Sequence, residues 1–77
     1  MPNTIVGGSP EVREEIERAL DVLKKDRYKA TVREDENSEE LSITFEFGAN
    51  DQTLKFKKGE WRSRGAIEKK IIDDLDI

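Results

Sequence analysis

Positively charged side chains gather in one stretch near the carboxyl end of the sequence. Residues 55 to 70 hold seven Lys or Arg and two Glu, a net charge of +5, whereas the whole chain of 77 residues has a net charge of −4. Clustered cations bind phosphate backbones or acidic protein surfaces. This basic block is therefore the candidate contact site for an anion or a partner. It comprises Lys55, Lys57, Lys58, Arg62, Arg64, Lys69 and Lys70.

The other charged segments are acidic. Residues 1–54 have a net charge of −6 and residues 71–77 a net charge of −3, and five of the seven residues from Glu34 to Glu40 are Asp or Glu. Carboxylates are ligands for hard cations, but this run has neither the Asp-x-Asp-x-Asp-Gly spacing of a calcium loop nor a Gly for its sharp turn. We interpret residues 34–40 as a solvated loop and expect no metal site.

Residue composition also argues against catalysis. The chain contains no His and no Cys. It therefore lacks the commonest general base, the commonest transition-metal ligand and any thiolate nucleophile. The abundant carboxylates fall on expected helix surfaces and in the acidic run, where solvent keeps them poor acids and bases at neutral pH. We predict a non-enzymatic protein without a catalytic residue or a cofactor.

Length and patterning predict one small domain. Residues 1–8 form a loose lead-in or a short edge strand at Thr4–Val6, and residues 9–77 form a single α+β domain. The sequence shows no signal peptide and no membrane-spanning stretch, so we expect a soluble, cytoplasmic monomer without membrane contact.

The central element is residues 41–47, Leu-Ser-Ile-Thr-Phe-Glu-Phe, which alternates apolar and polar side chains as a half-buried strand does. Further strands are predicted at 28–33 and 52–57, and helices at 10–26 and 64–75, the second capped by Ser63. The fold is then α-β-β-β-α, a three-stranded antiparallel sheet with two helices packed on one face. Residues 61–63 either add a strand or place Trp61 as a lid on the core edge, and we favour the lid.

The periodicity also separates the core from the solvated side of the sheet. The predicted core is Val12, Ile16, Leu20, Leu23, Tyr28, Val32, Leu41, Ile43, Phe45, Phe47, Leu54, Phe56, Ile67, Ile71 and Leu75. The opposite sheet face is predicted to be polar, with Lys29, Thr31, Arg33, Ser42, Thr44, Glu46, Thr53, Lys55 and Lys57.

The element order α-β-β-β-α, with cations opening the last helix, is similar to double-stranded-RNA-binding domains. Those domains carry a Ser-Lys-Lys-x-Ala-Lys-type run at the last helix. Here Ser63 is followed by Arg64-Gly-Ala-Ile-Glu68, so only Arg64 matches a basic position. Their first hairpin loop enters the minor groove of the duplex, but here the acidic run 34–40 would be repelled. The resemblance implies nucleic-acid binding through the basic block, which these departures oppose.

The first predicted helix resembles those of computationally designed proteins. Ser9-Pro10-Glu11 opens it, charged residues fill its surface, and a single apolar stripe faces inward. This resemblance implies a designed or redesigned miniprotein. Three hypotheses follow: a stable domain without a readable biochemical activity, a small natural phage- or plasmid-type factor that binds a protein partner, and a nucleic-acid-binding module. We favour the first.

Overall fold

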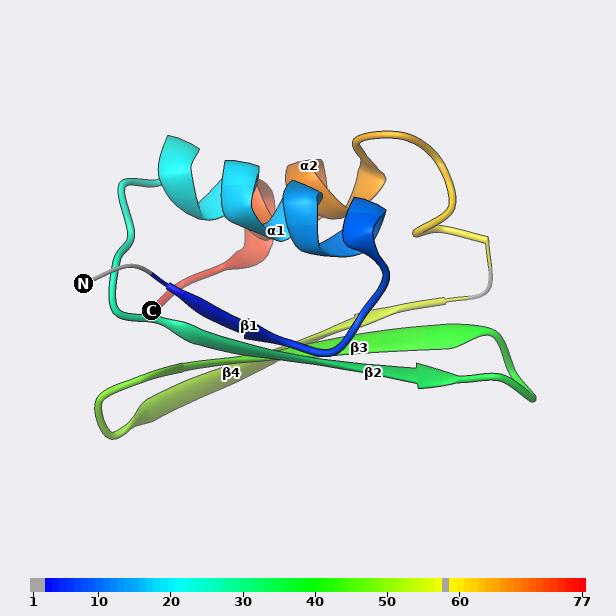
Figure 1. Cartoon of the computed structure of the whole chain (residues 1–77), viewed down its shortest axis with the longest axis horizontal. Helices are drawn as coiled ribbons and strands as arrows, with labels where there is room; N and C mark the ends of the chain where they lie inside the picture. The colour runs from blue at the N-terminus through cyan, green and yellow to red at the C-terminus, as the bar shows by residue number, and fades with distance from the viewer. Residues whose placement is uncertain (1–2, 58) are drawn as a thin grey trace.

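The computed structural model describes residues 3–57 and 59–77, and Lys58 of the basic block lies outside these residues. Two helices lie side by side on one face of a single sheet (Figure 1). The elements in chain order are β1 (Thr4–Val6), α1 (Pro10–Val22), β2 (Lys29–Asp35), β3 (Glu40–Phe47), β4 (Asn50–Phe56) and α2 (Ala66–Asp74). The predicted α+β class with two helices is confirmed.

The prediction of a three-stranded antiparallel sheet is wrong. The sheet is mixed and has four strands in the order β1-β2-β3-β4, with β1 parallel to β2 and the other pairs antiparallel. Thr4–Val6 thus forms an edge strand, and the backbone N–H of Thr4 donates to the carbonyl of Tyr28 at 2.9 Å. Three residues are too few to show a periodicity in the sequence. Whether they form a strand depends on the partner strand.

Helix α1 begins where its sequence predicts and ends earlier. Ser9 caps it by accepting a hydrogen bond from the N–H of Val12 at 3.4 Å, and Pro10 occupies the first turn. The predicted end at residue 26 is wrong, since the helix stops at Val22 and Lys24 takes a positive φ of 57°. A left-handed residue cannot continue a right-handed helix, so the chain turns there toward β2.

The two hairpins are tighter than predicted. Strand β2 continues to Asp35 and β3 begins at Glu40, so both ends of the acidic run are paired in the sheet. The second turn has only two residues, Gly48 and Ala49, and Phe47 pairs with Asn50 across it. Gly48 has a φ of 60°, the left-handed value that two-residue hairpin turns use at their first position.

The predicted core is confirmed except at three positions. Phe47 is 40% exposed and stacks on the ring of Tyr28, with 4.6 Å between the ring centroids. Leu23 and Leu75 are only partly buried, because each lies just beyond the end of its helix. The buried cluster gains three residues that were not in the predicted core, Ile5, Ala19 and Ala30.

Helix α2 is shorter than its prediction at both ends. It runs from Ala66 to Asp74 instead of 64–75, and Ser63 does not cap it, because Gly65 occupies the capping position without a side-chain hydrogen bond. Trp61 lies in a turn, where it is partly buried against the core. The structure therefore agrees with Trp61 as a lid on the core edge and places no strand at 61–63.

We predict that Gly7→Ala lowers the free energy of unfolding by about 3 kcal/mol, and Gly59→Ala by only about 1 kcal/mol. Both glycines have a left-handed φ, 80° and 84°, so adding a side chain has the same conformational cost at each position. A Cβ at Gly7 would lie 2.8 Å from the carbonyl oxygen of Val32, whereas at Gly59 it meets nothing within 4 Å. Urea denaturation of both variants measures the difference, and equal losses would contradict a close approach of this loop to β2.

Candidate functional site

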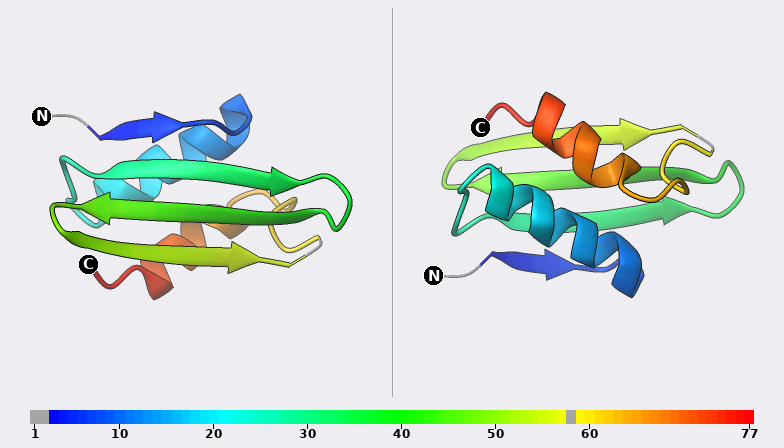
Figure 2. Two further views of the ribbon diagram at one scale, coloured as in Figure 1. Left: turned by 90° about the horizontal axis from the view of Figure 1, so that it is seen from below. Right: turned by 90° about the horizontal axis from the view of Figure 1, so that it is seen from above.

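The fold divides the basic block among three surfaces. Lys55 projects from the sheet face that the helices leave bare, and Lys57 is exposed just after β4. Arg62 and Arg64 lie in the turn before α2, while Lys69 and Lys70 lie on α2 itself. The views along both faces of the sheet show α2 on the opposite side from the bare face (Figure 2). The described residues of the basic block therefore do not form one continuous patch.

Arg62 contacts the acidic run instead of solvent alone. Its guanidinium lies 2.8 Å from the Glu39 carboxylate and 5.8 Å from the centre of the Trp61 ring. The indole N–H of Trp61 donates to the backbone carbonyl of Glu39 at 2.9 Å. Glu39 lies at the end of the β2–β3 turn and has a positive φ of 55°. These contacts hold the chain in that turn. The sequence places these two segments 22 residues apart, and nothing in its local pattern pairs them.

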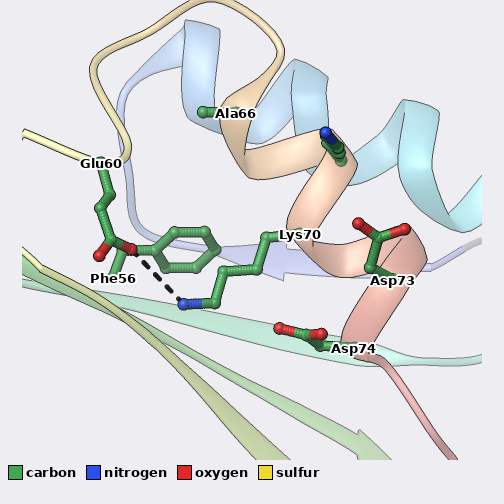
Figure 3. Close-up of a pocket in the computed structure, with 7 residues that line it drawn as sticks. Phe56, Glu60, Ala66, Lys70, Asp73 and Asp74 are labelled. Carbon is green, nitrogen blue, oxygen red and sulfur yellow. Dashed lines mark ion pairs between the residues drawn. The ribbon is translucent and has the colours of Figure 1, made fainter.

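Lys70 is half-buried against the edge of the sheet. Its ammonium donates to the backbone carbonyl of Lys55 at 2.6 Å, lies 3.6 Å from Glu60, and sits 4.8 Å from the centre of the Phe56 ring. Figure 3 shows the extended Lys70 side chain reaching past Phe56 toward Glu60. These contacts line an open cavity of about 310 Å³ with Ala66, Lys69, Asp73 and Asp74. Lys70 thus acts as a bridge between α2 and β4.

A larger groove of about 630 Å³ lies between the first turns of the two helices and the turn before α2. Carboxylates from α1 and guanidinium groups from the turn share its walls. Glu14 pairs with Arg18 on α1, and an oxygen of Glu15 accepts a hydrogen bond from the backbone N–H of Glu68 at 3.4 Å. Its lining is Ser9, Glu11, Val12, Glu14, Glu15, Arg18, Trp61, Arg62, Arg64, Gly65 and Glu68.

The contact between Glu15 and Glu68 explains how α2 begins without a cap of its own. The first N–H groups of a helix need acceptors and favour negative charge. Gly65 offers no side chain, and the carboxylate of Glu15 reaches across from α1 to supply one acceptor. Sequence reasoning missed this role, because Glu15 looks like any other acidic residue in the first half of a surface helix. The uncapped Gly65 is the only local signal that an acceptor must come from elsewhere.

Gln52 closes the other end of the same helix. Its amide N–H donates to the carbonyl of Asp74 at 2.8 Å, and its oxygen accepts from the N–H of Asp76 at 2.7 Å. Gln52 pairs with the buried Phe45 across the sheet and lies two residues before the buried Leu54. It therefore shares their face, the helix-facing side of β4. A polar residue at an inward strand position needs a hydrogen-bond partner, and that pattern signals such a contact from sequence.

The bare face of the sheet matches the polar face predicted from alternation. Thr31, Thr44 and Thr53 are neighbours across three strands, and the hydroxyl oxygens of Thr44 and Thr53 lie 3.0 Å apart. Lys29, Arg33, Glu46 and Lys55 extend from the same face and are exposed. The face carries both signs of charge without an exposed aromatic ring, so it offers no stacking surface for single-stranded bases.

Within residues 3–57 and 59–77, no group of three or more acidic side chains is arranged to hold a metal ion. Neither helix in this part of the chain is long and apolar enough to cross a membrane. In comparisons with protein-family models, curated proteins and solved structures, none matches this chain. Its functional assignment therefore rests on the side chains described above.

We predict that Glu15→Ala lowers the free energy of unfolding by about 1 kcal/mol, the usual value of a lost helix cap. Glu17→Ala, at an exposed position on the same helix, removes the same charge and is the matched control. Urea denaturation midpoints of the two variants give the comparison. Equal midpoints would show that the carboxylate of Glu15 does not support the start of α2.

We also predict that Trp61→Phe lowers the free energy of unfolding by about 1 kcal/mol, because it removes one partly buried hydrogen bond and keeps most of the apolar contact. Arg62→Gln should have a smaller effect, since its ion pair with Glu39 is largely solvated. Amide hydrogen exchange at residues 36–40 should accelerate in Trp61→Phe. A larger loss in Arg62→Gln would assign the turn contact to the ion pair instead of the indole.

Proposed function

We propose that this protein is a non-enzymatic α+β domain whose polar side chains serve the stability of the fold, without a readable biochemical activity. The observation that carries the proposal is how the side chains of the candidate sites are used. Glu15 caps α2, Lys70 bridges α2 and β4, and Arg62 pairs with Glu39. A ligand that bound these groups would compete with those contacts. The designed or redesigned origin inferred from the first helix stays a prediction.

The distribution of charge supports this proposal over nucleic-acid binding. A duplex-binding surface needs several cations on one face, aimed at successive phosphates. Here the Lys55 side chain projects from the bare face, whereas α2 covers the other face and its Lys70 reaches only the edge of the sheet. Arg64 shares its groove with the carboxylates of Glu11, Glu14, Glu15 and Glu68. Glu39 of the acidic run 34–40 lies beside Arg62, and the negative charge of that run would repel a phosphate backbone approaching the guanidinium.

The same contacts bear on the alternative of a factor that binds a protein partner. In that hypothesis the acidic run and the basic block are complementary patches for a partner. The pair between Arg62 and Glu39 joins the two segments within one chain. Part of their complementarity is therefore satisfied internally, which supports a structural role. A partner that required this contact would have to displace an interaction that also fixes the β2–β3 turn.

We predict that the amide NMR spectrum of the labelled protein does not shift when a short RNA duplex is added at physiological salt. Exposed cations spread over several surfaces give only weak, salt-sensitive attraction, so small shifts at low salt should disappear as salt is added. Arg64→Gln is the matched control, since Arg64 has no ion pair among the described contacts. Shifts at residues 55–70 that persist in salt and vanish in Arg64→Gln would overturn the proposal in favour of nucleic-acid binding.

A further inference from the structure

The two edges of the sheet differ in how much backbone they leave available. Strand β1 has three residues, and the Arg13 guanidinium occupies its outward carbonyl at Ile5, 3.2 Å away. Strand β4 has seven residues. An edge strand of that length presents backbone donors and acceptors to which another strand can pair. The β4 edge is therefore the larger unpaired surface of the sheet.

The backbone groups along the β4 edge can be assigned to individual residues. The Lys55 carbonyl points away from β3, since it accepts from Lys70 instead of from the neighbouring strand. Backbone direction alternates along an antiparallel strand, so the N–H and C=O groups of Thr53 and Asp51 point the same way. Asp51, Thr53 and Lys55 are all exposed, and their side chains project from the bare sheet face. The β4 edge thus offers three alternate residues whose backbone groups point outward.

We propose that two copies of this chain pair through β4, antiparallel and with Thr53 at the two-fold axis. Each outward residue then meets an outward residue of the second copy, so the backbone groups exchange hydrogen bonds in matched pairs. Asp51 lies opposite Lys55 of the second copy, and Lys55 lies opposite Asp51. The register therefore forms two oppositely charged cross-strand pairs around a central Thr53 pair, and the two sheets of four strands become one continuous sheet.

Neither charge is satisfied in this way within one chain. Asp51 pairs in the sheet with Glu46, a like charge, and Lys55 pairs with Ser42. Among the described residues, the side chains of Asp51 and Lys55 form no ion pair. A second copy supplies the opposite charge at each position. The contact between Lys70 and the Lys55 carbonyl need not be lost, since a carbonyl oxygen has two lone pairs and accepts two hydrogen bonds.

Helix α2 also reaches the β4 edge. It crosses β4 at an angle, and its carboxyl end projects past the β4 edge (Figure 2). That end carries Asp73, Asp74 and Asp76, which lie unfavourably at the negative end of the helix dipole. The two-fold axis places it over the opposite end of the second copy's β4. There the cavity of about 310 Å³ lies beside Phe56, and its lining is mixed in charge, with Lys69 and Lys70 alongside Glu60, Asp73 and Asp74 (Figure 3).

The proposal replaces the monomer expected from sequence with a symmetric dimer, and a charge-swap experiment tests it on the full chain. Sedimentation equilibrium should show a reversible dimer for the unaltered protein. Asp51→Lys and Lys55→Asp should each raise the dimer dissociation constant about tenfold or more, because each places like charges opposite each other twice. Mixing the two variants should restore dimerisation as a heterodimer, since one copy is then basic and the other acidic at both positions.

Lys29→Asp is the matched control, because it makes the same charge change on the same sheet face, on a strand away from the β4 edge. It should leave the dissociation constant unchanged. Amide hydrogen exchange gives an independent readout, since the outward N–H groups of Asp51, Thr53 and Lys55 are protected only when a second strand covers them. A protein that stays monomeric up to about 1 mM, or variants that fail to recover dimerisation on mixing, would overturn the proposal.

Discussion

The fold depends on covering one apolar sheet face with two short helices. Strand β3 supplies the centre of that face, with Leu41, Ile43 and Phe45 almost fully buried. Ile16 of α1 and Ile71 of α2 close over them, and both are inaccessible to solvent. A chain of this length buries a modest share of its surface, so each apolar position on this face matters. The strands keep their register because a slip of one residue would turn the face to water.

Polar side chains then satisfy backbone N–H and carbonyl groups at the helix ends and sheet edges. Glu15 and Gln52 satisfy the two ends of α2, and Arg13 and Lys70 each occupy a carbonyl at one edge of the sheet. In every case the side chain comes from a different element than the backbone group it meets. Such contacts join the helical layer to the sheet, or one helix to the other. They give specific structural roles to Glu15, Arg13 and Lys70, which composition alone presents as ordinary surface charges.

Sequence reasoning recovered the features that depend on local pattern. The alternation of residues 41–47 located β3, and the spacing from Val12 to Leu20 located α1 with its Ser9 cap. It left open or missed what a partner decides. Thr4–Val6, predicted as either a loose lead-in or a short edge strand, is a strand beside β2. Phe47 has the parity of a core residue, but it is 40% exposed and stacks on Tyr28.

The candidate site shows the same division. Its cations could be named from composition, and the bare sheet face of Lys55 could be predicted from alternation. Their dispersal could not, since it follows from contacts over long sequence separations, such as Arg62 with Glu39 and Lys70 with the Lys55 carbonyl. Charge clustered in sequence stays clustered in space when one helix face or one strand carries it. Here a strand, a turn and a helix share it.

A sheet with helices on only one side must leave its other face and both its edges to solvent, and this chain treats the three differently. The face is polar and mixed in charge, with Thr side chains that need no partner beyond each other and water. The β1 edge is short, and Arg13 occupies its outward carbonyl. The β4 edge is longer and keeps most of its outward backbone, while the carboxyl end of α2 projects past it. Because opposite charges flank Thr53 at equal spacing, that edge is complementary to itself. Association there would replace the hydrogen bonds that its outward backbone groups make with water by hydrogen bonds between two copies.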